Sequence, residues 1–178
     1  MIPVNEPLIS EKEIAYVTDC LQTGWISSAG PYIERFEREW ASYCNRKHGI
    51  AVSNGTVALE LALSVLDLPE NAEVILPSFT IVSCLEAVLR NNLTPVLTEC
   101  DSRTYCMDVE DVRCRITDRT AAIMPVHIYG HPVNMEAILE IAGTYHLRVI
   151  EDAAEAHGAE CFVNNQWSRC GSFGEVSC

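Results

Sequence analysis

The chain has 178 residues, of which 48% are hydrophobic and 21% charged, an ordinary globular composition that can bury a real core. Its 25 acidic residues against 12 basic ones give a net charge of −13, which argues against nucleic-acid binding because no basic stripe is available for phosphates. No basic segment followed by an apolar run begins the chain, and no stretch is long enough to span a bilayer. We therefore expect a cytoplasmic protein without a membrane partner, folded as a single domain over residues 1–178.

The chain contains nine cysteines and five histidines, without Cys-x-x-Cys pairs or zinc-finger spacing. Several cysteines, including Cys44 and Cys84, lie on segments that look like buried faces, where cysteine acts as a small hydrophobic residue. We expect reduced thiols and no metal.

Two helices are predicted at the start. Ser10 and Glu13 form a capping box, and the apolar spacing that follows predicts a helix ending near Gly24. Pro31 opens a second helix that runs to about Cys44.

Strands and helices then alternate. Strands are predicted at His48–Ser53, Glu73–Leu76, Thr94–Thr98, Ala121–Val126 and Leu147–Ile150. Helices are predicted at Thr56–Leu66, Ile81–Leu89, Val109–Ile116 and Met135–Tyr145. Ala159–Val163 and Gln166–Ser168 look like a hairpin joined through Asn164-Asn165, and residues 171–178 look like the approach to another strand.

This alternation predicts an α/β fold, with a mostly parallel sheet and helices on both of its faces. The carboxyl ends of parallel strands share one edge, where ligands gather. Pro77-Ser78-Phe79-Thr80, the segment His127 to His131, and Asp152 should therefore meet on one rim.

The stretch from Val149 to Gly158 is the most informative. A buried strand runs directly into Glu151 and Asp152, and a buried acid stays ionised only beside a cation or hydrogen-bond donors. A protonated ring nitrogen of a cofactor would suit Asp152. Alternatively, either acid simply caps the following turn.

Ser53-Asn54-Gly55-Thr56 joins a predicted strand to a helix. The first amides of that helix could hold a phosphate, or the segment could be an ordinary turn capped by Ser53 or Asn54. It matches neither the Walker loop nor Gly-x-Gly-x-x-Gly. His127, Tyr129 and His131 could touch a ligand, although such residues more often satisfy loop backbone groups.

Lysine is scarce. The two lysines, Lys12 and Lys47, fall outside the predicted rim, so neither can be assigned as a Schiff-base residue.

Several of these motifs recur in one family. They are Gly24-Trp25-Ile26-Ser27-Ser28, Ser53-Asn54-Gly55-Thr56, Pro77-Ser78-Phe79-Thr80, Pro125 to Gly130, Glu151 to Ala159, and Gly171-Ser172-Phe173-Gly174. In this order they resemble the DegT-type sugar-nucleotide aminotransferases, which are pyridoxal-phosphate enzymes with the aspartate aminotransferase fold. The similarity within the family is greatest to the perosamine-synthase type, which aminates C4 of a GDP-4-keto-6-deoxy sugar.

The resemblance implies roles for five residues. Asp152 would pair with the protonated pyridine nitrogen, and Glu155 would lie near the ring hydroxyl. The Gly55 and Thr56 amides would hold the cofactor phosphate. Ile81 would cover the ring face, where the family often has an aromatic residue.

The resemblance also implies a sugar-nucleotide substrate, an amino-acid donor such as glutamate, and a homodimer. It places the Schiff-base lysine and the small C-terminal domain beyond Cys178, so we expect the 178-residue chain alone to be inactive. Two alternatives stay open: a cofactor-binding remnant or subunit of a longer homologue, and the sugar dehydratase branch, in which histidine replaces the lysine.

Overall fold

A computed structural model describes residues 2–3 and 6–178. The chain divides into two compact units, one formed by residues 1–43 and 47–51 and the other by residues 44–46 and 52–178. The expectation of a single domain stays a prediction.

The first unit contains two helices, α1 (Glu11–Thr23) and α2 (Pro31–Tyr43). The capping box at Ser10 is confirmed, because its hydroxyl and the Glu13 carboxylate satisfy each other's backbone amides. Gly24 ends α1 in the left-handed conformation, with φ of 78°.

The second unit carries the sheet, and its elements follow the predicted alternation. In chain order they are α3 (Gly55–Ser64), β1 (Glu73–Pro77), α4 (Val82–Arg90), β2 (Thr94–Thr98), α5 (Val109–Arg115), β3 (Thr120–Ile123), η1 (Ile128–Gly130), α6 (Met135–Tyr145), β4 (Arg148–Glu151), β5 (Glu160–Val163), β6 (Gln166–Arg169) and β7 (Val176–Ser177).

Five strands form a parallel sheet in the order β2-β1-β3-β4-β7. The chain passes from β1 outward to β2 and then returns to β3 on the other side of β1. The strand order therefore reverses between β1 and β3, and ligands of such sheets bind outside the strand ends at this reversal.

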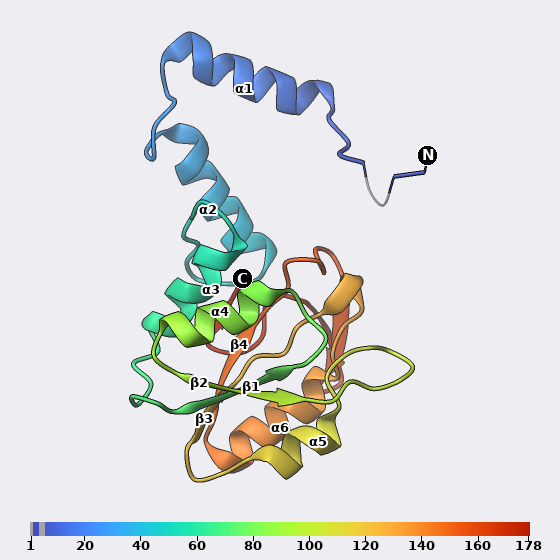
Figure 1. Cartoon of the computed structure of the whole chain (residues 1–178). Helices are drawn as coiled ribbons and strands as arrows, with labels where there is room; N and C mark the ends of the chain where they lie inside the picture. The colour runs from blue at the N-terminus through green and yellow to red at the C-terminus, as the bar shows by residue number, and fades with distance from the viewer. Residues whose placement is uncertain (1, 4–5) are drawn as a thin grey trace. The chain divides into compact units, whose positions relative to one another are not determined.

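Both faces of the sheet are covered, as predicted: α3 and α4 lie on one face, and α5 and α6 on the other (Figure 1). Side chains of a strand alternate between the two cores. On β1, Ile75 packs with the α5–α6 side, whereas Val74 and Leu76 pack with the α3–α4 side. All three side chains are fully buried, so both faces contribute hydrophobic stabilisation.

The predicted strand His48–Ser53 is wrong. Residues 48–53 adopt no regular structure, and the Ala51 amide donates to the Glu37 carboxylate over 2.8 Å. Ile50 is 72% exposed. Apolar residues alone cannot make a strand, and among the described residues this segment has no edge to pair with.

The predicted strand Ala121–Val126 is shorter in the structure. β3 ends at Ile123, and pairing resumes only as a single bridge between Val126 and Asp152. Pro125 lies between the two and has no amide to donate, so the ladder is interrupted.

The predicted hairpin and last strand are confirmed. Asn164 and Asn165 both have positive φ, 51° and 61°, as a tight hairpin turn requires. β7 pairs with β4 in parallel.

Glu73 at the start of β1 gives a pH-dependent prediction. Its carboxylate, only 4% exposed, accepts hydrogen bonds from the Thr117 hydroxyl and the Arg119 guanidinium, and the Thr117 bond above all lowers the pKa of Glu73 below 4.5. A depressed folded-state pKa stabilises the fold above the unfolded-state value, and that contribution is lost as pH falls through the folded-state pKa.

We therefore expect Glu73→Gln to unfold at lower urea concentration than the wild type at pH 7. The difference should shrink as the pH falls below 4.5. Glu70→Gln, at an exposed neighbouring position, serves as the control with the same charge change. A Glu73→Gln difference that stays constant from pH 7 to pH 3 would contradict the assignment.

Candidate functional site

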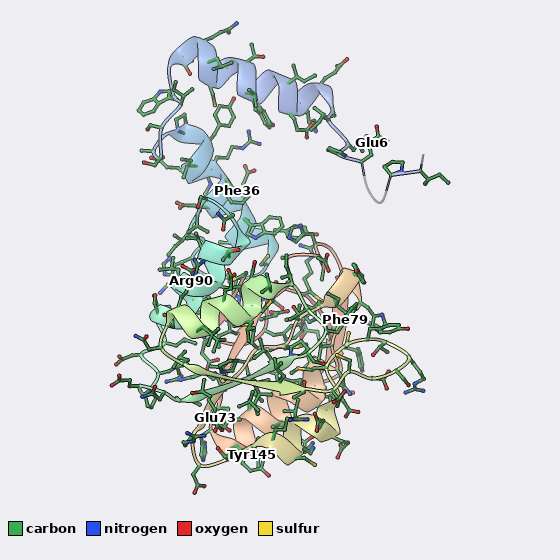
Figure 2. The ribbon with its side chains drawn as sticks, in the orientation of Figure 1. Glu6, Phe36, Glu73, Phe79, Arg90 and Tyr145 are labelled. Carbon is green, nitrogen blue, oxygen red and sulfur yellow. The ribbon has the colours of Figure 1, made fainter. Side chains whose placement is uncertain are left out.

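A cavity of about 350 Å³ opens at the carboxyl ends of β1, β3 and β4. Residues of the three segments expected to share a rim line it, namely Phe79, Thr80, His127, Ile128, Tyr129 and Asp152, together with the neighbouring Ile81, Val126, Ala154 and Glu155. In Figure 2, Glu73 marks the start of β1 and Phe79 the loop that follows the end of this strand. The cavity thus lies where the strand order reverses, the expected place for a ligand in a parallel sheet.

Asp152 forms the polar wall of this cavity and is only 4% exposed. Its Oδ1 accepts the Ala154 amide over 3.1 Å, and its Oδ2 accepts the Cys84 thiol over 3.2 Å. Neither donor is a cation, and two carboxylate oxygens can accept further bonds. A cationic or N–H group placed in the cavity would complete this environment.

Cys84 makes a hydrogen bond to Asp152 that the sequence did not reveal. The thiol is fully buried on α4, between the Thr80 hydroxyl and the Asp152 carboxylate. Burial and the nearby Asp152 charge raise the pKa of Cys84 to about 12. The thiol therefore stays protonated and donates to Asp152. The helical spacing of Cys84 predicted its burial but not its partner.

Glu155 lines the same cavity from the turn after Asp152. Its Oε2 accepts the Tyr129 amide over 2.7 Å. Tyr129 has a φ of 50°, unusual for an aromatic residue, and Gly130 follows with a φ of 80°. A Cβ on Gly130 would lie 3.1 Å from the Glu155 carbonyl oxygen, so the two loops pack closely. One carboxylate oxygen of Glu155 is thus engaged, and its partner oxygen can still accept.

Ile81 occupies the N-cap position of α4 and lines the cavity. It is 62% exposed, so its apolar side chain can cover a flat ligand. Two aromatic residues also line the cavity, Phe79 and Tyr129: the Phe79 ring is 6.1 Å from that of Tyr129 and 5.8 Å from that of Tyr105.

Gly55 and Thr56 begin α3 and are not part of the cavity lining. Asn54 caps the helix by accepting the Val57 amide over 3.0 Å, which leaves the Gly55 and Thr56 amides without an intrahelical acceptor. The Thr56 hydroxyl is hydrogen-bonded to that of Ser83 at 2.8 Å. Ser83 lies two residues after Ile81, so the amino ends of α3 and α4 are side by side, close to the cavity.

Glu151 is not part of the cavity lining, and its carboxylate has a structural role. It is fully buried, and its carboxylate accepts the amides of Gly171 and Phe173 over 2.7 and 2.8 Å. His127 Nε2 lies 2.8 Å from Glu151 Oε1, whereas His127 Nδ1 accepts the Val133 amide. Because Nδ1 accepts, the ring proton is on Nε2 and is donated to Glu151. Both nitrogens of His127 are occupied, and neither is available to a ligand.

His127, Glu151 and Cys170 also bring possible metal ligands within 4.8 Å of one another. Their hydrogen bonds argue against a metal. A metal on Nε2 would need the ring proton on Nδ1, which faces the Val133 donor, and the Glu151 oxygens already accept amides. His131, the other candidate of this loop, is exposed.

A wider groove of about 750 Å³ lies at the other end of the sheet, between the end of α6 and the start of β4. Arg148 and Glu175 on its wall pair with each other at 3.3 Å. It contains none of the predicted site residues.

Across the described residues, no helix is both long and apolar enough to cross a membrane.

The fold of this chain is shared with aminotransferases of known structure. An aminotransferase from Psychrobacter cryohalolentis is 32% identical, with a TM-score of 0.88, over 98% of this chain and 44% of that chain. DesV of S. venezuelae, solved in complex with a ketimine intermediate, is 36% identical with a TM-score of 0.81, over 93% of this chain and 45% of that one. The architecture is that of the PLP-dependent aminotransferase fold.

The protein belongs to the DegT/DnrJ/EryC1/StrS aminotransferase family, whose model matches residues 7–178. GDP-perosamine synthase of Escherichia coli O157:H7 is 43% identical over 99% of this chain and 47% of its own length. A dTDP-3-amino-3,6-dideoxy-alpha-D-galactopyranose transaminase of Aneurinibacillus thermoaerophilus is 43% identical over 94% of this chain and 45% of its own length. The chain thus spans about half the length of the curated relatives that it matches.

Proposed function

We propose that this chain provides the cofactor-binding part of a pyridoxal-phosphate-dependent aminotransferase that acts on a keto sugar nucleotide. The observation that carries the proposal is Asp152, a buried carboxylate on the cavity wall whose two recorded donors, Cys84 and Ala154, are both uncharged. An unneutralised buried carboxylate favours a cationic ligand group. The protonated nitrogen of a pyridine ring is such a group.

The other predicted residues fit the rest of this cofactor. Glu155 would accept a hydrogen bond near the ring hydroxyl, and Ile81 would cover the ring. The Gly55 and Thr56 amides, at the positive end of α3, would hold the phosphate. A volume of about 350 Å³ is within the range of small-molecule sites.

Bound pyridoxal phosphate would supply an electron sink for proton removal at the carbon that bears the transferred amino group. The residues of this chain would keep that sink effective. Asp152 would hold a proton on the ring nitrogen, and the Cys84 thiol would fix the Asp152 side chain. His127 would brace the loop that carries the Glu155 contact, because its two nitrogens join Val133 and Glu151.

The proposed substrates are a 4-keto-6-deoxy sugar nucleotide and an amino-acid donor such as glutamate. The similarity to a GDP-perosamine synthase supports this choice. We also propose a cytoplasmic homodimer. Helix α1 buries no residue, and Ile14, Val17 and Leu21 on it are 59%, 61% and 67% exposed, which suits a second copy of the chain.

A chimera tests the function. The matching half of the E. coli O157:H7 GDP-perosamine synthase would be replaced by this chain, and amino transfer from glutamate to a GDP-4-keto-6-deoxy sugar would be measured. We expect an active chimera, and a loss of at least about a hundredfold in kcat on Asp152→Asn.

A matched chimera with Asp118→Asn, an exposed aspartate before β3, should keep full activity. A chimera that folds and binds the cofactor but eliminates water from the sugar without transferring nitrogen would support the dehydratase alternative. A folded chimera that does neither would contradict the proposed function.

A further inference from the structure

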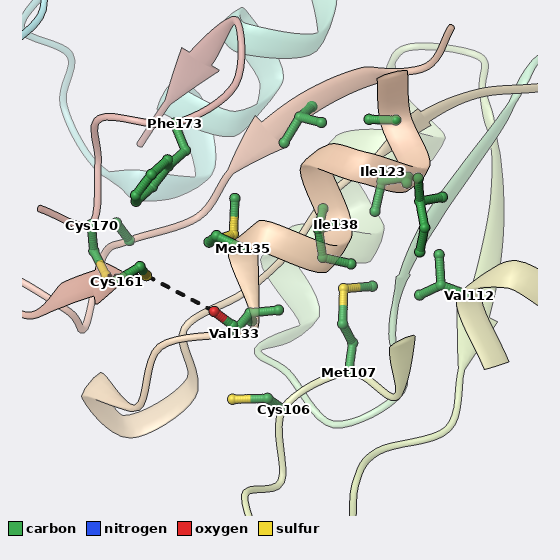
Figure 3. Packing of buried hydrophobic residues seen from close by; sticks show 14 of the residues in the cluster. Cys106, Met107, Val112, Ile123, Val133, Met135, Ile138, Cys161, Cys170 and Phe173 are labelled. Carbon is green, nitrogen blue, oxygen red and sulfur yellow. Dashed lines mark hydrogen bonds between the residues drawn. The ribbon is translucent and has the colours of Figure 1, made fainter. Parts of the chain in front are cut away.

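Two cysteines of the hairpin lie on the same face. Cys161 is opposite Ser168 in the register of β5 and β6, and Cys170 follows two residues later, its amide bonded to the Ala159 carbonyl. Residues two apart on a strand point to the same side. The two sulfur atoms are 3.7 Å apart, and Figure 3 shows both side chains at the edge of the same buried cluster.

The contact between the two thiols shifts their pKa values in opposite directions. The hydrogen bond between the two sulfur atoms is the main reason that the pKa of Cys161 is lowered and the main reason that the pKa of Cys170 is raised. Cys161 is therefore the better nucleophile of the pair, because the thiolate is the reacting form. The Cys161 thiol also donates a hydrogen bond to the Val133 carbonyl over 3.9 Å (Figure 3).

The pair is buried in the closed hairpin, with Cys161 6% and Cys170 3% exposed. The hairpin is a separate two-stranded sheet, and its outer face carries Phe162 and Trp167, 49% and 62% exposed. A two-stranded element at the surface opens locally at little cost compared with global unfolding. A small reagent can reach the sulfur atoms during such openings.

We propose that Cys161 and Cys170 are an oxidation site, which a low-molecular-weight disulfide converts into an intramolecular disulfide that locks β5 to β6. The Cys161 thiolate attacks one sulfur of the reagent RSSR, which forms a mixed disulfide and releases RS⁻. The Cys170 thiolate then attacks the Cys161 sulfur and releases the second RS⁻. The two cysteine protons end on the two RSH products, so two thiols are oxidised and one external disulfide is reduced.

The test treats the 178-residue chain with oxidised glutathione, alkylates the remaining thiols in acid-quenched samples and digests with trypsin. Cleavage after Arg148 and Arg169 places Cys161 in residues 149–169 and Cys170 in residues 170–178. We expect these two peptides joined, with the mass of their sum less two hydrogens, and separated again by dithiothreitol.

Variants identify the sulfur atoms. Cys161→Ser and Cys170→Ser should each abolish the joined peptides, whereas Cys114→Ser, at an exposed cysteine, should leave them unchanged. Joined peptides that persist in Cys170→Ser would assign the bond to Cys178 and overturn the proposal. Oxidation of the wild-type chain that yields only glutathione adducts on single cysteines would overturn it as well.

Discussion

Replacing Glu151 by glutamine should destabilise the fold by about 3–5 kcal/mol, the range for removing one member of a buried charged hydrogen-bond network. The carboxylate is fully buried and accepts from Gly171, Phe173 and His127. A glutamine amide would turn its NH₂ group toward one of these donors, and one buried N–H would lose its acceptor. The shift would be measured as the change in the free energy of unfolding in urea.

Glu160→Gln provides the control for this prediction, since it removes the same charge from an exposed position on β5 and should change stability by less than about 0.5 kcal/mol. Equal effects of the two substitutions would mean that the Glu151 network contributes little to stability. The Arg46 guanidinium donates to the carbonyls of Gly171 and Gly174 in the same loop and lies 4.0 Å from Glu151 Oε2.

Asp152→Asn should weaken the binding of pyridoxal phosphate by about ten- to a hundredfold, as expected for loss of a charged hydrogen bond of about 1.5–3 kcal/mol. Asparagine keeps the shape of the side chain and can still accept the Ala154 amide, but it carries no charge for a ring cation. Equilibrium titrations of the 178-residue chain, followed by absorbance, would give the dissociation constants.

Asp118→Asn is the matched control, because it removes one exposed charge at the opposite end of β3. Its affinity should equal that of the wild type. An Asp152→Asn affinity that is also unchanged would mean that the cofactor does not depend on this carboxylate.

The convergence of the rim loops was predictable from the sequence for a simple reason. Parallel strands end at one edge, so the segments after β1, β3 and β4 had to meet there. Ile81, Asp152 and Glu155 accordingly line one cavity. The roles assigned to them, and to Gly55 and Thr56, stay predictions.

Contacts between distant segments were not predictable. For Cys84 the sequence predicted only a buried position on a helix. Its hydrogen bond to Asp152 depends on how α4 packs over the end of β4. For Glu151 the sequence suggested only a possible cap of the following turn, because the amides of Gly171 and Phe173 reach its carboxylate from some twenty residues away. The predicted strand His48–Ser53 is wrong for a different reason. Its sequence pattern is compatible with a strand, but a strand also needs a neighbouring strand to pair with.

The most direct test of the central claim, that Asp152 faces the ring nitrogen of the cofactor, is nitrogen-15 NMR of pyridoxal phosphate labelled at that nitrogen. Bound to the chain at a pH where the free ring is unprotonated, the nitrogen should show the shift of a protonated pyridinium, and Asp152→Asn should remove that signal. A bound cofactor with an unprotonated nitrogen in the wild-type chain would contradict the account.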